Sequence, residues 1–306
     1  MASGASMAGE AGAFRAGFVA VVGRPNVGKS TLINALVGTK VSIVTPRPQT
    51  TRHRILGIRN EPDAQMVFVD TPGMHSRARK AMNRLMNRAA DAAIADAELL
   101  LFVSEANRWT AEDERALERI RAAARCPVIA VLNKIDKVHP REALLATIAE
   151  RAAQFEYAEI VPVSARRGDN LARLVEVVRR YLPESPPLFP ATAVSDRSES
   201  FRAAEIIREK LTLALHQEVP YGLTVEIERY ERDENRLTIG ALIWVERESQ
   251  KGIVVGKGGE LLKRAGRAAR LELKALYGIP VHLDLWVKVR ENWADSEEQL
   301  LKLGYE

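Results

Sequence analysis

The sequence predicts an α/β protein in which a doubly wound sheet is followed by a smaller α+β domain. Across residues 16–183, short apolar runs alternate with helical patterns, as successive βα units do. From residue 200 to 306 the order changes to helix, strand, strand, helix, helix, strand. The proline-rich segment 184–199 between them is expected to be an extended linker, because proline ends helices and donates no hydrogen bond.

A glycine-rich loop follows the first predicted strand, residues 18–22. Residues 23–30 read G-x-x-x-x-G-K-S and run into a helical pattern over 31–37, which is the context that a phosphate-binding P-loop needs. The loop amides and the helix N-terminus attract phosphate. We expect Lys29 to reach the β- and γ-phosphates and Ser30 to bind Mg²⁺. The residues predicted to bind nucleotide in this loop are Gly23, Arg24, Pro25, Asn26, Val27, Gly28, Lys29, Ser30 and Thr31.

A later strand pattern ends in D-T-P-G, residues 70–73. Asp70 is expected to hold Mg²⁺ through water, and the Gly73 N–H to contact the γ-phosphate. A threonine upstream would complete the Mg²⁺ shell only when the γ-phosphate is present. Thr51, directly before Arg52, is the preferred candidate, and Thr50 is the alternative.

The base is indicated by N-K-x-D, residues 133–136, at the end of another apolar run. The Asp136 carboxylate accepts hydrogen bonds only, so it matches the two adjacent donors of guanine and leaves unpaired groups against adenine. Ser164 and Ala165 follow the next predicted strand, and the Ala165 N–H is expected to face guanine O6. The predicted nucleotide contacts outside the P-loop are Asp70, Thr71, Pro72, Gly73, Asn133, Lys134, Asp136, Ser164 and Ala165.

These ordered motifs predict a GTPase, and two residues bear on its rate. Met74 follows Gly73, where Ras-like enzymes carry a glutamine that orients water, so intrinsic hydrolysis is expected to be slow. Asn26 either ligates K⁺ beside the β–γ bridge, where a cation would stabilise developing charge, or only shapes the loop. The predicted catalytic group is Asn26, Lys29, Thr51, Asp70 and Gly73.

The C-terminal region contains G-x-x-G between two helical patterns, at residues 256–259. Together with the order of its elements, this loop is similar to the RNA-binding loop of a type-2 KH domain, where glycines let the nucleic-acid backbone approach. Residues 251–274 contain seven basic residues and two acidic ones, although residues 186–306 contain 18 basic and 20 acidic residues. The positive charge is therefore local to the loop. The predicted RNA contacts are Val255, Gly256, Lys257, Gly258, Gly259, Lys263, Arg264, Arg267 and Arg270.

Two further basic runs flank the predicted switch regions. One contains Arg47, Arg52, His53 and Arg54, and the other runs from Arg77 through Arg79, Lys80 and Arg84 to Arg88. They either touch RNA directly or form a charged surface in a mobile region.

Composition is ordinary, with 46% hydrophobic and 28% charged residues. The one cysteine, Cys126, cannot form an internal disulfide and is expected to be an inert thiol in a reducing cytoplasm. No apolar run approaches the roughly 20 residues that cross a bilayer. Residues 1–15 are expected to be a disordered tail and not a signal peptide, and most of this segment is rich in Ala, Gly and Ser.

Taken together, the P-loop sequence G-R-P-N-V-G-K-S, the T-T-R and D-T-P-G motifs, the proline linker and the C-terminal G-x-x-G resemble the Era family of GTPases. The resemblance covers about residues 17–305. It implies contact with the 3′ end of small-subunit (16S) ribosomal RNA. From the motifs above we expect Mg²⁺ to bind with GTP or GDP, and we expect the protein to be a monomer. The resemblance also implies a role in small-subunit assembly and peripheral contact with the inner membrane face. The alternative is a GTPase switch that regulates a protein partner through its C-terminal module.

Overall fold

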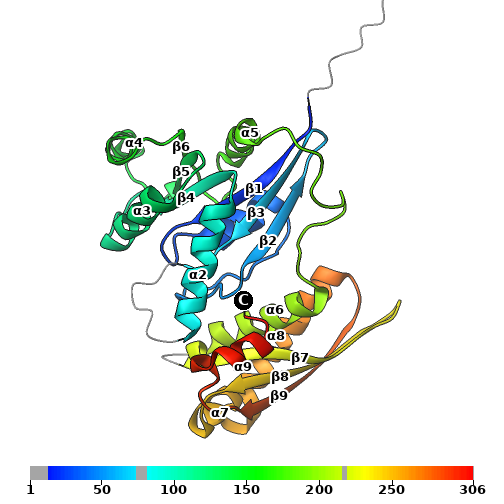
Figure 1. The fold of residues 1–306 in the computed structure, drawn as a ribbon. Helices are drawn as coiled ribbons and strands as arrows, with labels where there is room; N and C mark the ends of the chain where they lie inside the picture. The colour runs from blue at the N-terminus through cyan, green and yellow to red at the C-terminus, as the bar shows by residue number, and fades with distance from the viewer. Residues whose placement is uncertain (1–12, 74–80, 216–218, 306) are drawn as a thin grey trace, which may run out of the picture.

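The computed structural model describes residues 13–73, 81–215 and 219–305, and it has two domains (Figure 1). In the N-terminal domain, six strands lie in the order β2-β3-β1-β4-β5-β6. All neighbouring pairs are parallel except β2 with β3. The strands are β1 (Arg15–Val22), β2 (Ile55–Asn60), β3 (Ala64–Asp70), β4 (Leu99–Glu105), β5 (Val128–Asn133) and β6 (Glu159–Pro162).

Helices cover both faces of this sheet, as the alternating pattern predicted. α1 (Lys29–Val37) and α5 (Leu171–Tyr181) share one apolar core with the sheet. α2 (Ala81–Asp96) and α3 (Ala111–Ala123) share the other, while α4 (Ala143–Gln154) packs on a smaller cluster beside β5. The carboxyl ends of the parallel strands therefore meet at one edge, where ligands of such sheets bind.

The C-terminal domain has a three-stranded sheet in the order β7-β8-β9, with β7 and β8 antiparallel and β8 and β9 parallel. Its elements are α6 (Glu199–Ala214), β7 (Leu223–Arg232), β8 (Leu237–Val245), α7 (Glu248–Val255), α8 (Glu260–Tyr277) and β9 (Val281–Val289). One apolar core joins α6, α7 and α8 to a single face of the sheet. The predicted fold class, including the α-β-β-α-α-β order, is confirmed. A short helix, α9 (Glu297–Lys302), was not anticipated.

The linker segment is held along the edge of the first sheet (Figure 1). The buried Gln65 side chain accepts from the amides of Leu188 (2.7 Å) and Phe189 (2.8 Å). The Ile58 amide donates to the Val194 carbonyl (3.0 Å) and the Leu56 amide to Asp196 (2.9 Å). These bonds fix the path of the chain between the two domains.

Candidate functional site

The P-loop conformation depends on two of its glycines. Gly23 and Gly28 have φ values of 151° and 103°. A Cβ at Gly23 would lie 2.3 Å from the Val103 carbonyl oxygen, and one at Gly28 would lie 2.4 Å from the Asn133 amide nitrogen. Only glycine lets the loop turn this tightly against β4 and β5.

Lys29 lies buried inside the loop. Its Nζ donates to the carbonyl oxygens of Gly23 (3.0 Å) and Arg24 (3.1 Å). Burial lowers the pKa of Lys29 to about 8, with Asp70 opposing the shift and Arg24 adding to it. The ammonium is thus poorly compensated, so a phosphate beside it would be strongly favoured.

Three oxygen-bearing side chains converge at the end of β3. Ser30 Oγ lies 2.9 Å from Thr51 Oγ1, which lies 3.5 Å from Asp70 Oδ2. Asp70 is fully buried, and its Oδ1 has no hydrogen-bond partner among the described residues. Burial raises the pKa of Asp70 above its ordinary value. A hard oxygen-ligand set with an orphaned carboxylate oxygen fits Mg²⁺ and its waters.

The structure distinguishes the two threonine candidates. Thr50 Oγ1 bonds Thr45 Oγ1 (2.6 Å) and the Arg47 carbonyl (2.8 Å), within its own loop. Thr51 alone of the two joins Ser30 and Asp70. Consecutive residues in an extended segment point in opposite directions, and this separates them.

The base-recognition residues meet between β5 and the loop after β6. Asn133 donates to the Val27 carbonyl (2.9 Å) and accepts from the amides of Lys134 (2.8 Å) and Ala165 (3.0 Å). Ser164 Oγ donates to Asp136 Oδ1 (2.7 Å), and this bond, set against a smaller effect of burial, lowers the pKa of Asp136. The Ala165 N–H donates to Asn133 in this structure, and its contact with guanine O6 stays a prediction.

A cavity of about 460 Å³ lies beside the P-loop, and Lys134 is the base-recognition residue that lines it. Its walls come from the P-loop, residues 43–47 and 49–51, Gly73, Lys134 and Arg166. Gly73 approaches the P-loop closely, since a Cβ there would lie 2.9 Å from Pro25 Cγ. Met74 and the basic residues Arg77, Arg79 and Lys80 lie outside the described residues.

Asn26 and Lys134 close the rim of the cavity. Asn26 has a left-handed φ of 64°, and its side chain donates to the Pro46 carbonyl (3.1 Å). Its own carbonyl accepts from Lys134 Nζ (2.7 Å). Lys134 also pairs with Glu105 at the end of β4.

No sequence motif predicted the ion pairs that hold the P-loop residue Arg24. The Arg24 side chain donates to Asp113 (2.9 Å) and lies 3.4 Å from Glu105. Asp113 also caps α3 by accepting from the Thr110 amide (2.9 Å) and hydroxyl (2.8 Å). The T-x-x-D spacing could have identified the cap, but no local pattern reveals a partner about 90 residues away.

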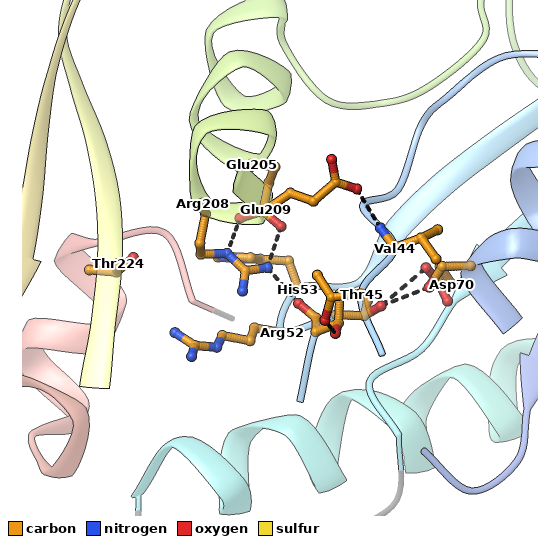
Figure 2. Close-up of polar contacts among 12 residues, drawn as sticks. Val44, Thr45, Arg52, His53, Asp70, Glu205, Arg208, Glu209 and Thr224 are labelled. Carbon is orange, nitrogen blue, oxygen red and sulfur yellow. Dashed lines mark hydrogen bonds and ion pairs between the residues drawn. The ribbon is translucent and has the colours of Figure 1, made fainter. Parts of the chain in front are cut away.

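Residues 40–54, which we call switch I, run from this cavity into the C-terminal domain (Figure 2). The buried Arg52 guanidinium donates to the carbonyls of Leu223 (2.7 Å), Pro220 (2.9 Å) and Tyr221 (3.1 Å). Arg47 donates to the Thr212 carbonyl (3.1 Å) and to the Leu215 carbonyl. Arg47 and Arg52 therefore hydrogen-bond the two domains together. Neither of the alternatives considered for this basic run, a direct RNA contact or a charged surface in a mobile region, describes this arrangement.

α6 supplies the opposite side of this contact, which no sequence pattern indicated. Glu209 accepts from the Val44 amide (2.8 Å). Arg208, buried, makes two bonds to Glu205 (2.6 and 2.7 Å) and donates to the Thr50 carbonyl. Figure 2 shows Arg208 directed at Glu205, and Glu209 at Val44. A buried ion pair therefore holds the residue next to Thr51.

His53 fixes the C-terminal residues against the same interface. Its ring stacks on Tyr305 (centroids 4.3 Å apart), meets Phe201 edge-on (5.0 Å) and bonds the Gly304 carbonyl through Nδ1 (3.1 Å). Burial lowers the pKa of His53 to about 4, although Glu205 opposes the shift. The ring is therefore neutral at physiological pH.

The predicted RNA loop lies far from the cavity in sequence, between α7 and α8. Gly256, Gly258 and Gly259 have φ values of 74°, 60° and 80°. A Cβ at Gly256 would lie 2.8 Å from Leu261 Cβ, so only glycine lets the two helices meet. Lys257 and Gly258 are exposed at the tip, and Val255 and Gly259 are half-buried beside them.

The basic residues of α8 form a stripe. Lys263, Arg267, Arg270 and Lys274 recur at spacings of four, three and four residues and share one exposed helix face. Arg264 is exposed beside them. Within the described part of the chain, none of these five cations has a carboxylate within 4 Å. Unneutralised positive charge in a row is what a phosphate backbone requires.

Comparisons with known proteins match both domains of the chain. Residues 18–134 match the family described as 50S ribosome-binding GTPase, and residues 218–294 match the KH domain. GTPase Era of Stenotrophomonas maltophilia (strain R551-3) is 51% identical over 290 residues, which is 95% of this chain and 97% of the relative. GTPase Era of Actinobacillus pleuropneumoniae serotype 3 (strain JL03) is 49% identical over 94% and 95%.

Two solved structures are similar over the whole length. One is Era in complex with MgGDPNP and nucleotides 1506–1542 of 16S ribosomal RNA, and the other is a single-residue variant of Aquifex aeolicus Era bound to GDP.AlF4-. Each has a TM-score of 0.91 and 41% identity, over 95% of this chain and 99% of the other. Among the described residues no helix is long and apolar enough to cross a membrane. With both domains matched and about half of all residues identical, this chain belongs to the Era family of GTPases.

Proposed function

We propose that this GTPase binds the 3′ end of 16S ribosomal RNA in assembly of the small ribosomal subunit, and that its nucleotide state controls how the RNA-binding domain is held. One observation carries the proposal. Thr51 lies with Ser30 and Asp70 at the cavity, while Arg52 and His53, the next two residues, are buried against the C-terminal domain. Ordering of switch I by a γ-phosphate therefore acts on that domain directly. The solved relative bound to MgGDPNP and 16S nucleotides supports this choice of RNA.

The motif residues are proposed to bind the nucleotide as follows. Lys29 binds the β- and γ-phosphates, and Asp136 reads guanine. Ser30 and Thr51 would hold Mg²⁺ directly and Asp70 through water, and the ion supplies neutralisation of phosphate charge. The amides of Gly73 and of the P-loop would donate to the phosphates, since both segments line the cavity.

Slow hydrolysis with K⁺ at Asn26 extends this proposal. Asn26 stands on the rim of the cavity, and its carboxamide now bonds Pro46 in switch I. We expect that side chain to leave Pro46 and ligate a monovalent ion beside the phosphates when switch I closes over nucleotide. Hydrolysis should then be faster in K⁺ than in Na⁺, and Asn26→Ala should remove the difference. Equal rates in the two salts at matched ionic strength would refute the K⁺ site.

The RNA role is tested at the loop tip. The double variant Lys257→Asp/Gly258→Asp removes one cation and adds two carboxylates where phosphates should bind. Its affinity for 16S 3′-end RNA should collapse, while its GTP affinity should stay unchanged. Aspartate tolerates positive φ, and a side chain at Gly258 meets nothing within 4 Å. Gly278→Asp is the matched control, because Gly278 also has positive φ (72°) and open space. Unchanged RNA affinity in the double variant would remove the loop from the RNA site.

Cytoplasmic location with peripheral contact to the inner membrane face is a further expectation from family resemblance. Co-sedimentation of the full chain with anionic vesicles tests it, and recovery of the protein only in the supernatant would count against it.

A further inference from the structure

Helices α6, α7 and α8 cover one face of the C-terminal sheet, and the opposite face is covered at its β7 end, where Tyr305 bonds the buried Thr224 (3.0 Å), but is open around Trp286. Leu237, Ile239, Ala241, Ile243 and Val245 of β8 point into the core shared with α6, α7 and α8. Because side chains alternate along a strand, the intervening positions face the opposite way. The paired register places Thr238, Gly240, Leu242 and Trp244 of β8 on this open face, opposite His282, Asp284, Trp286 and Lys288 of β9.

Trp286 lies on this open face. It is 49% exposed, and a Cβ at Gly240 would lie 3.3 Å from its ring, so the indole rests over the gap that glycine leaves. Leu242, its direct partner across the strands, is buried beneath the surface. In the described ranges, no other aromatic ring or cation packs on the Trp286 indole. A large apolar ring is thus held in place with one face free.

Charges of both signs lie beside Trp286, since Asp284 and Lys288 are its neighbours on the same face of β9 and Glu226 lies across the sheet from it. Arg290 lies over the Trp244 ring at 4.1 Å and Lys288 at 6.0 Å. Neither cation has a carboxylate within 4 Å among residues 13–73, 81–215 and 219–305. The acids on the face have hydrogen-bond partners, since Glu226 accepts from Trp244 Nε1 (2.7 Å) and Asp284 lies 3.2 Å from His282 Nε2.

We propose that this open face, centred on Trp286, Lys288 and Arg290, is a second binding site for single-stranded RNA. A base stacks on the free indole and its phosphates pair with the two cations, which is how sheet-surface aromatics bind RNA in other folds. Trp286 and Lys288 are two residues apart on one strand, about 6.6 Å. The face lies on the opposite side of the sheet from the helices that flank the G-x-x-G loop, so a strand leaving that loop would pass the edge strand β9 to reach it.

The inference deepens the proposed RNA function, and two RNA lengths separate the two sites. A labelled 6-nucleotide single strand is long enough for a G-x-x-G loop, which clamps four nucleotides, and a 24-nucleotide strand can span both sites. By fluorescence anisotropy, Trp286→Ala should weaken the 24-mer roughly 10-fold or more and leave the 6-mer unchanged. Trp286→Phe should restore most of the affinity, because it keeps an aromatic face. Leu145→Ala, a change at another highly exposed apolar residue, should alter neither.

Tryptophan emission gives a second measurement. Binding of the 24-mer should quench it in the parent protein, and Trp286→Phe should lose this component while still binding. Parent-like affinity of Trp286→Ala for the 24-mer would overturn the second site. Weaker binding of this variant to small ribosomal subunits with unchanged affinity for naked RNA would also overturn it, because the face would then contact a ribosomal protein. Loss of both RNAs in the Lys257/Gly258 double variant would still uphold the primary RNA site, so the two proposals fail separately.

Discussion

Removing Arg208 is expected to separate the two domains. Arg208 makes two short bonds to Glu205 (2.6 and 2.7 Å) and holds the Thr50 carbonyl. Both side chains are at least nine-tenths buried. Burial alone would raise the pKa of Glu205, but Arg208, with a smaller contribution from Arg52, outweighs it and the pKa is lowered. Arg208→Met therefore leaves an ionised carboxylate without its main partner.

The magnitude follows from the burial of the pair. Breaking a buried ion pair on one side costs about 3–5 kcal/mol, because the remaining charge stays desolvated. Here the protein has a less costly route, since Glu205 lies at the domain interface and becomes hydrated if the domains part. The variant therefore cannot lose more free energy of unfolding than the two domains gain by docking on each other. Beyond that limit the domains separate, and the variant should populate an open form. Replacing both residues, as Glu205→Leu with Arg208→Met, leaves no buried charge and should restore most of the docking.

Small-angle scattering and GTP turnover measure this together. Arg208→Met should increase the radius of gyration and slow hydrolysis, because Thr51 loses its anchored neighbour, while GDP affinity changes little. Arg232→Met is the control, since Arg232 makes an equally short two-bond pair with Glu199 but in an exposed place, and its loss should leave the shape unchanged. A compact, fully active Arg208→Met, or a double variant as open as the single one, would refute the reasoning.

Three further outcomes are expected. The pKa of His53 in the folded protein is about 4, below its ordinary 6.5, so between these pH values the unfolded or open form binds a proton that the docked form does not. Docking of the two domains should therefore weaken by about 2 kcal/mol from pH 7 to pH 5. A denaturant titration in which His53→Phe keeps the same pH dependence would contradict this. Lys29 has a pKa of about 8, so above this pH it must take up a proton before it can bind phosphates as a cation. GDP affinity should therefore fall by about tenfold from pH 7.5 to pH 9. Calorimetry showing the same loss in Lys29→Met would exclude Lys29 as the titrating group. Asp136→Asn should weaken GTP and admit xanthine nucleotide, and unchanged GTP affinity would remove Asp136 from base recognition.

The sequence by itself determined the parts of this protein whose chemistry is local. The P-loop, D-T-P-G, N-K-x-D and G-x-x-G each place their residues within a few positions, and their flanking strands and helices follow from periodicity. The fold class and the family follow from their order along the chain. Strict alternation likewise predicted the last strand, and β9 occupies residues 281–289.

Only the tertiary structure decided how these parts are joined. Thr51 is separated from Thr50 by its contact with Asp70, which lies on another strand, and the Ala165 N–H is directed to Asn133 by the packing of two loops. Arg52 meets its carbonyl partners across more than 160 residues. Such pairs leave no periodic signal, because the positions of two distant residues depend on every element folded between them. The open face around Trp286 was hidden for the same reason, since alternation marks two faces of a strand and only packing shows which one stays uncovered.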